Sequence, residues 1–413
     1  MWYFVAYAFR SAAFYVSLPI AGRLLAADEV GRFFYLLAIV NLTSVAATLG
    51  MGSYVTRKSY SNRTVSYVFL SACTVAVVVH AVGILGGALF WSGVFAVGAF
   101  SCVRALSLLG ETYLLASGNR ATITALHWCH GVAFLVVGAT AAIMFRRAES
   151  FLFATAVADV LIVVSAWFVV GRSQSLRGQL LQRIARIAVN LRVVRRGLIY
   201  GAPILLASLA NLGLNSFDRF IVKHYLGYED LAIFSVMYTL AFASSRFIGQ
   251  PFNQVASQLY MSERAGPDCQ DRIRRQGVMA TGAIAACTWA TMIIGNDVLK
   301  LIGSAYVVDP VNFGLVGLSA MFALLFTMSS LHLKRSGNTG AFAARIVVAA
   351  AVNMALSVLL VPRLGIVGAS ISTYVAYSLL FLTCWKSSSD RVVNELVVLA
   401  VLVVSALLLV SLQ

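Results

Sequence analysis

Long apolar stretches, separated by short polar or charged breaks, run along nearly the whole chain. A hydrocarbon layer about 30 Å thick is crossed by roughly 20 helical residues, because each residue rises about 1.5 Å. Lipid cannot satisfy backbone N–H and C=O groups, so each stretch must form a helix. This length criterion predicts about 13 spans, near 2–25, 33–52, 65–89, 92–116, 121–145, 151–170, 198–222, 231–252, 277–295, 311–331, 340–361, 366–385 and 396–412.

The composition supports an integral membrane protein. Of 413 residues, 60% are hydrophobic and only 11% are charged, whereas an ordinary globular domain is about 25% charged. A soluble protein of this length is therefore excluded. The six cysteines are spread along the chain and five fall inside predicted spans, so a disulfide-rich secreted scaffold is also excluded. The first stretch lacks a basic leading segment and is predicted to be a retained span.

The net charge of +16 comes mainly from loops on one side of the membrane. Loops that follow even-numbered spans carry 19 basic residues, seven of them between Arg172 and Arg196, whereas the opposite loops carry six. The positive-inside rule therefore predicts a cytoplasmic N-terminus and a cytoplasmic middle loop, which also suits anionic lipid headgroups. The basic excess is thus a topology signal, and a nucleic-acid partner is excluded.

A short motif recurs in the two halves of the chain. An acidic pair, an aliphatic residue, a small residue and a phenylalanine follow each other at 28–33 and again at 229–234. Ser-Gly-Asn likewise occurs at 117–119 and at 336–338. The positions are equivalent in two six-span units, and an even number of spans per unit gives parallel repeats. Two packed bundles are an architecture for alternating access.

Short motifs of a known family occur at 18–21, 28–33, 50–52, 201–203, 215–222, 226–227 and 362–369. On these motifs the chain, from about residue 2 to 385, resembles the MOP (multidrug/oligosaccharidyl-lipid/polysaccharide) exporter superfamily. The resemblance is greatest to its polysaccharide-flippase branch, the Wzx-type translocases of O-antigen or repeat units. A segment at 396–412 departs from the family's usual twelve or fourteen spans.

The resemblance implies an all-α fold of two six-helix bundles, related by a pseudo-two-fold axis along the membrane normal, with a thirteenth C-terminal span. The predicted parts are an N-terminal bundle at 1–170, a basic cytoplasmic linker at 171–197, a C-terminal bundle at 198–385 and the additional segment at 386–413. The implied activity is movement of undecaprenyl-diphosphate-linked oligosaccharide across the bacterial inner membrane, for lipopolysaccharide or exopolysaccharide synthesis. A monomer is expected, with a polysaccharide polymerase and chain-length proteins as partners.

Charged residues inside predicted spans are the candidate functional residues, because burying a charge in lipid is costly. Arg10, Arg104 and Arg246 are candidates for binding the diphosphate and sugar of the cargo, since a guanidinium stays protonated and offers paired donors to phosphate oxygens. Spans 1 and 8 face the central cavity in the resembled family, which favours Arg10 and Arg246. The alternative for each is an internal ion pair.

Carboxyl groups in the spans are candidates for a coupling proton or sodium ion, and no other cofactor is expected. Glu111 and Asp159 carry this hypothesis, with a structural ion pair as the alternative. Arg104 and Glu111 share one helix face but lie about 10.5 Å apart along the axis, so Asp159 is a candidate partner for either. Asp218 and Arg219 belong to a motif of the resembled family and are predicted to anchor a helix end.

No enzyme signature occurs in the sequence: it has no phosphate-binding loop ending in Gly-Lys-Ser/Thr, no nucleophile elbow and no cluster of metal ligands. His127 and His130 share a helix face, but two histidines fall short of a metal site, so both are predicted to be buried hydrogen-bonding residues. The alternatives to a flippase are a multidrug or small-molecule ion antiporter of the same superfamily, and a non-transporting scaffold of a glycan-synthesis complex.

Overall fold

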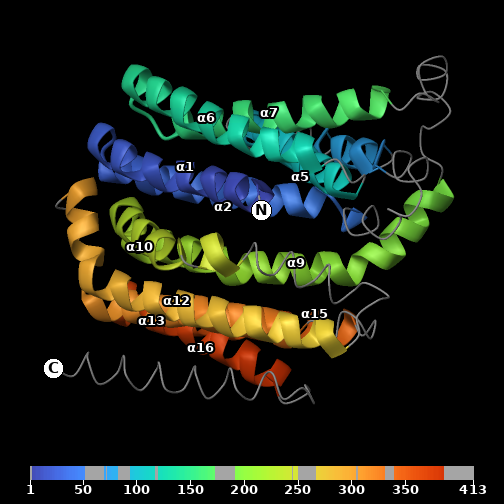
Figure 1. Cartoon of the computed structure of the whole chain (residues 1–413). Helices are drawn as coiled ribbons and strands as arrows, with labels where there is room; N and C mark the ends of the chain where they lie inside the picture. The colour runs from blue at the N-terminus through green and yellow to red at the C-terminus, as the bar shows by residue number, and fades with distance from the viewer. Residues whose placement is uncertain are drawn as a thin grey trace. The chain divides into compact units, whose positions relative to one another are not determined.

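The computed structural model describes residues 2–51, 69–70, 72–81, 94–116, 120–172, 191–243, 245–249, 267–303, 306–330 and 339–385. Every long regular element in these ranges is a helix (Figure 1). The elements are α1 (Trp2–Leu24), α2 (Ala27–Ala47), α5 (Val94–Ala116), α6 (Arg120–Phe145), α7 (Glu149–Arg172), α9 (Leu191–Leu226), α10 (Tyr228–Ala241), the π-helix η1 (Ser245–Gly249), α12 (Pro267–Ile302), α13 (Pro310–Ser329), α15 (Thr339–Leu364) and α16 (Ile366–Trp385).

Six helices in the described ranges are long and apolar enough to cross a membrane, or seven if the bent pair Gly277–Thr291 and Ile293–Ile302 forms one span. About 13 spans were expected over the whole chain. The segment at 396–412 lies outside the described residues, as do residues 173–190 of the linker and both Ser-Gly-Asn motifs. The thirteenth span therefore stays a prediction.

Several helices differ in length from the predicted spans. The helix α9 covers Leu191–Leu226 and α12 covers Pro267–Ile302, both well beyond the apolar stretches at 198–222 and 277–295. Hydropathy marks only the apolar part of a helix, whereas backbone hydrogen bonding continues through basic and polar flanks. The predicted span at 231–252 is interrupted instead, because α10 ends at Ala241 and η1 follows at Ser245.

The chain forms two compact units. The first unit contains Met1–Ser17 and Tyr35–Leu212, and the second contains Leu18–Phe34 and Gly213–Gln413. The boundary falls inside α1, α2 and α9, so each of these helices contributes to both units. The bundle limits expected from the sequence, at 1–170 and 198–385, stay a prediction.

The recurring acidic pairs begin two helices. Asp28 and Glu29 lie in the first turn of α2, and Glu229 and Asp230 lie in the first turn of α10. Negative side chains are favourable there because the helix dipole leaves partial positive charge on the first N–H groups. The two copies of the motif also meet within the second unit, since a Cβ on Gly31 would lie 1.9 Å from the Tyr228 carbonyl oxygen.

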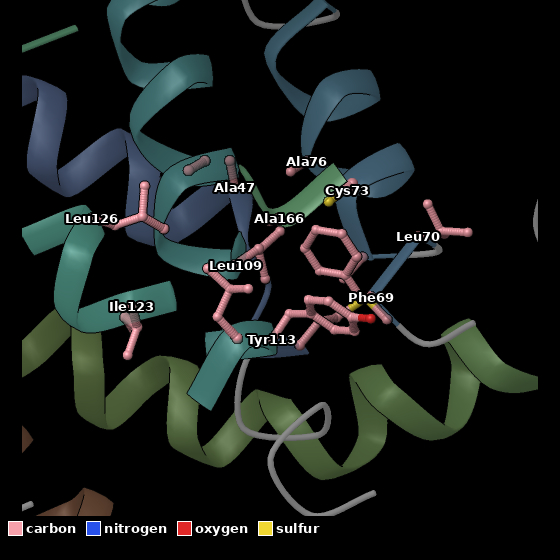
Figure 2. Packing of buried hydrophobic residues seen from close by; sticks show 14 residues of the cluster. Ala47, Phe69, Leu70, Cys73, Ala76, Leu109, Tyr113, Ile123, Leu126 and Ala166 are labelled. Atoms are coloured by element: carbon pink, nitrogen blue, oxygen red, sulfur yellow. The ribbon is translucent and has the colours of Figure 1, made fainter. Parts of the chain in front are cut away.

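Aromatic and small residues fill the core of the first unit (Figure 2). The rings of Phe69 and Tyr113 stack with their centroids 4.6 Å apart. Leu109 of α5, Leu126 of α6 and Ala166 of α7 are buried in the same cluster. This apolar packing holds α5, α6 and α7 together, and α5 and α7 carry Arg104, Glu111 and Asp159.

In the second unit, α16 packs closely against both α13 and α15. Gly365 separates α15 from α16 and has a φ of +60°, in the left-handed region that favours glycine. The rings of Tyr238 and Phe242 stack with their centroids 4.4 Å apart. This packing brings polar residues of α9, α15 and α16 together inside the unit.

Candidate functional site

The first unit contains a buried contact between an arginine, a glutamate and a histidine from three helices. Nη1 of Arg10 (α1) donates to Oε2 of Glu111 (α5) at 3.0 Å and lies 3.2 Å from Nδ1 of His127 (α6). Nε2 of His127 lies 3.8 Å from Oε1 of Glu111. The His127 side chain is fully buried, and the other two are 13% and 16% exposed. The three side chains form one electrostatic group.

A second group of similar composition lies in the same unit. Nη1 of Arg104 (α5) donates to both carboxylate oxygens of Asp159 (α7), at 2.8 and 3.2 Å. Ser107 Oγ donates to Oδ1 of Asp159 at 2.9 Å, and Nε2 of His130 lies 3.3 Å from the same oxygen. The Asp159 side chain is 1% exposed. Three helices therefore converge on this carboxylate.

Small and aromatic residues set the approach of α1 to α6. A Cβ on Gly131 would lie 2.8 Å from the Phe9 ring and 3.3 Å from Cα of Arg10, so only glycine allows this separation. The Phe9 and Trp128 rings contact each other at 4.2 Å between centroids, and Tyr7 meets His127 edge to face at 5.4 Å. This close packing puts Arg10 within reach of His127.

The charges of these two groups balance. Two guanidinium groups and two carboxylates cancel as long as both histidines are neutral. Buried charges are tolerated when they are paired and hydrogen-bonded, whereas an isolated charge in a low-dielectric interior is costly. We call these two groups together the charged cluster. Any anion or cation that enters the charged cluster therefore has to displace or compensate one of its members.

The second unit contains a buried carboxylate that is bonded by neutral donors. Asp218 of α9 accepts from Asn353 Nδ2 at 3.0 Å and Ser357 Oγ at 2.7 Å, both on α15. It also accepts from Thr373 Oγ1 of α16 at 2.7 Å. Asp218 is 1% exposed. Asp218 therefore links α9 to α15 and α16. Each hydrogen bond to a charged group stabilises the fold by about 1.5–3 kcal/mol.

Two guanidinium groups of the second unit form no ion pair within the described residues. Arg219 is 6% exposed, and its guanidinium lies over the rings of Phe34 and Tyr238 at 5.5 and 5.6 Å from their centroids. Arg246, in η1, forms no ion pair within the described ranges, and its charge acts on Arg219. Asp218 acts electrostatically on Arg219, so the half-buried Arg246 carries the excess positive charge of this group.

The comparisons with known proteins place the chain in a family. Residues 20–265 match a protein family that is described as “Polysaccharide biosynthesis protein”. The chain belongs to this family. A search of curated proteins found no match.

Solved structures of similar fold match nearly the whole chain. An inward-facing multidrug resistance MATE family transporter of the MOP superfamily is 11% identical, with a TM-score of 0.67 and coverage of 95% of each chain. Its outward-facing counterpart is 13% identical, with a TM-score of 0.63 over 96% of this chain and 95% of that one. A MOP superfamily transporter from Pyrococcus furiosus, whose pocket is described as reversed in polarity, is also 13% identical, with a TM-score of 0.64 and the same coverage.

The family match and the fold of these MOP-superfamily structures agree with the predicted resemblance. The polysaccharide biosynthesis protein is an all-helical, multi-pass membrane protein with a MATE-like fold. Because the sequence identities are only 11–13%, the solved structures show the fold alone and identify neither the cargo nor the mechanism.

The structure brings four of the predicted site residues together in pairs. Arg104 binds Asp159, and Glu111 binds Arg10 rather than Arg104. Both pairs match the ion-pair alternative, and the roles of the arginines in cargo binding and of the carboxyls in ion coupling stay predictions. His127 is buried and hydrogen-bonded, and His130 is buried against Asp159, as predicted for both. Arg246 belongs to the second unit.

Asp218 differs from its predicted role at a helix end, because it bonds to two other helices inside the unit. Its hydroxyl partners, Ser357 and Thr373, were not singled out from the sequence. The signal available was the spacing of Asn353 and Ser357, four residues apart on one face of an apolar helix. Within the described residues, no group of three or more His, Cys, Asp or Glu side chains could hold a metal ion.

Proposed function

We propose that this polysaccharide biosynthesis protein is a flippase for undecaprenyl-diphosphate-linked oligosaccharide, such as an O-antigen or exopolysaccharide repeat unit. The single observation that carries the proposal is Arg246, a half-buried guanidinium of η1 that forms no ion pair in the described ranges and acts on the buried Arg219. A membrane protein retains such a charge at considerable cost, and an anionic group of the cargo compensates it.

The family supplies the link to polysaccharide synthesis, and the MATE-like fold is one that transporters use. A diphosphate carries about two negative charges, and guanidinium groups bind phosphate oxygens through paired donors. We assign Arg246 and Arg10 to the diphosphate, with Arg104 contributing. Arg10 and Arg104 are already paired, so the cargo has to exchange places with Glu111 or Asp159 there.

In this proposal, two six-helix bundles related by a pseudo-two-fold axis rock about the cargo and expose it alternately to each leaflet. The lipid tail stays in the bilayer between helices. The protein lies in the bacterial inner membrane with its N-terminus in the cytoplasm, where the basic middle loop contacts anionic headgroups. The cycle is driven either by a proton or sodium gradient or by consumption of the product by a polymerase on the outer side.

The proposal is tested with purified full-length protein in liposomes that contain a fluorescent oligosaccharide linked to undecaprenyl diphosphate. Accessibility of the label to a membrane-impermeant quencher reports transfer between leaflets. We expect protein-dependent transfer, and we expect R246A to reduce the initial rate at least tenfold, because the diphosphate loses an unpaired guanidinium. Export of a cationic dye in the same liposomes, without glycolipid transfer, would instead establish the antiporter alternative.

Arg363 provides the matched control. It is exposed in the last turn of α15, and R363A removes the same chemical group. We expect R363A to transfer the glycolipid at the wild-type rate. Equal losses in R246A and R363A would refute the assignment of Arg246, and a normal rate in R246A would do so as well.

A further inference from the structure

The contact between Arg10 and His127 fixes the protonation state of the histidine. A guanidinium nitrogen can only donate, so Nδ1 of His127, 3.2 Å from Nη1 of Arg10, must be the acceptor. His127 is therefore neutral, with its proton on Nε2, which faces Oε1 of Glu111 at 3.8 Å. A second proton could enter only at Nδ1, the atom that Arg10 occupies. Proton binding and the Arg10 contact exclude each other.

The surroundings of His127 contain charged or titratable groups on every neighbouring helix. Tyr7 and Arg10 face it from α1, and Glu111 faces it from α5. His130 lies one turn along α6. Asp159 of α7 acts on the group through Arg10 and His130. Glu111 is thus the only carboxylate among the described residues that contacts both Arg10 and His127, and it can stabilise a positive charge on either.

Charge balance makes this histidine sensitive to an anion. The four charged members of the cluster cancel while His127 is neutral. A phosphate group bound to Arg10 would bring negative charge into a buried region, where an uncompensated charge is costly. The same phosphate would also draw Arg10 from Nδ1 and leave this nitrogen open to a proton taken up from the bulk solution. One proton on His127 restores part of the balance.

We propose that Nδ1 of His127 is a proton-binding site linked to binding of the cargo's diphosphate at Arg10. The inference rests on the proposed function, because it takes the diphosphate as the ligand of Arg10. In the empty cluster Arg10 donates to Glu111 and His127. In the loaded cluster Arg10 donates to the phosphate oxygens, and the imidazolium of His127 donates to Glu111. On release of the diphosphate, the proton leaves Nδ1 and Arg10 returns.

Proton binding and diphosphate binding favour each other. The loaded protein holds one more proton than the empty protein, so acid favours loading and alkali opposes it. Because linkage is reciprocal, diphosphate binding raises the affinity of His127 for the proton by the same factor. Where the uptake is one full proton, the affinity for the diphosphate changes about tenfold per pH unit.

One amide variant of each histidine distinguishes the role of His127 from that of His130. H127N places an amide oxygen close to the position of Nδ1, so it keeps an acceptor for Arg10 but cannot take up a proton. H130Q is the matched control on the same helix, because its amide nitrogen takes the place of Nε2, the atom that faces Asp159. Elution as a single symmetrical peak establishes that each variant folds, and H127Q replaces H127N if that variant does not.

The experiment is titration calorimetry of farnesyl diphosphate into the purified full-length protein between pH 5.5 and 8. Two buffers with different ionisation enthalpies give the number of protons taken up. The ionisation of the probe itself contributes equally to all variants, so differences between them belong to the protein. We expect H127N to take up about one proton fewer than wild type on binding. Its affinity for farnesyl diphosphate should therefore change with pH by up to about tenfold less per pH unit than that of wild type. We expect H130Q to behave as wild type.

Equal proton uptake in wild type and H127N would overturn the inference, and so would loss of uptake in H130Q alone. The R10A variant tests the assignment of the diphosphate to Arg10 independently of the proton site at His127. If R10A binds farnesyl diphosphate as tightly as wild type, or if wild type does not bind it, then the diphosphate assignment at Arg10 is wrong whatever His127 does. Loss of binding in R10A with normal uptake in H127N refutes the proton site alone.

Discussion

The ion pair between Arg104 and Asp159 makes a quantitative prediction about stability. R104M keeps much of the length and apolar stem of the side chain but leaves Asp159, which is 1% exposed, without its cation. Removing one partner from a buried ion pair costs about 3–5 kcal/mol, because the remaining charge is uncompensated. Ser107 and His130 still contact Asp159, so we expect the lower end of this range.

The reciprocal variant and the double variant complete a cycle. In D159N the unpaired guanidinium is 23% exposed and keeps part of its hydration, so we expect a smaller loss than in R104M. R104M/D159N has no buried charge at this site, and replacing both members of a buried ion pair is often nearly neutral. We therefore expect the double variant to be more stable than R104M alone, with a coupling energy of about 2 kcal/mol or more.

The assay is equilibrium unfolding of the full-length protein in mixed detergent micelles, followed by circular dichroism. A loss below about 1 kcal/mol in R104M, which is typical of exposed pairs, would refute the reasoning. A double variant no more stable than R104M would also refute it. Glycolipid transfer by the double variant then separates the two roles of Arg104, since lost transfer with recovered stability indicates contact with the cargo.

Two further predictions concern the second unit. G31A places a methyl group 1.9 Å from the Tyr228 carbonyl oxygen, so the backbone has to shift, and we expect a lower folded yield in size-exclusion chromatography. G282A meets nothing within 4 Å and should fold normally; equal yields would refute the close approach. D218A leaves three buried donors without their acceptor, at about 1–3 kcal/mol each, so equilibrium unfolding should show a loss of at least about 3 kcal/mol. A loss under about 1 kcal/mol would contradict the bonding that we describe for Asp218.

Local chemistry could be predicted from the sequence. The acidic pair Asp28 and Glu29 lies at the start of α2 because the helix dipole favours it there, and its second copy begins α10. The axial separation of Arg104 and Glu111 on one helix was enough to expect other partners for both. Each of these inferences depends only on residues within a few turns of one another.

The partners across helices were harder to predict. The pairing of Arg10 with Glu111 joins residues that are 101 positions apart, and it depends on which faces of α1 and α5 meet. That choice is set by packing, for example by the room that Gly131 leaves beside Phe9. Asp218 shows the same limit, because its neutral partners on α15 and α16 are hydroxyl and amide groups that resemble many others along the apolar helices.

The central claim is that an anionic, lipid-linked glycan is the cargo and that guanidinium groups inside the membrane recognise it. The most direct measurement compares transfer of two fluorescent lipids by the wild-type protein in liposomes, one with the oligosaccharide on undecaprenyl diphosphate and one with the same oligosaccharide on an uncharged polyprenyl ether. The account predicts rapid transfer of the diphosphate lipid and little transfer of the uncharged one. Equal rates for the two lipids, or transfer of neither, would contradict it.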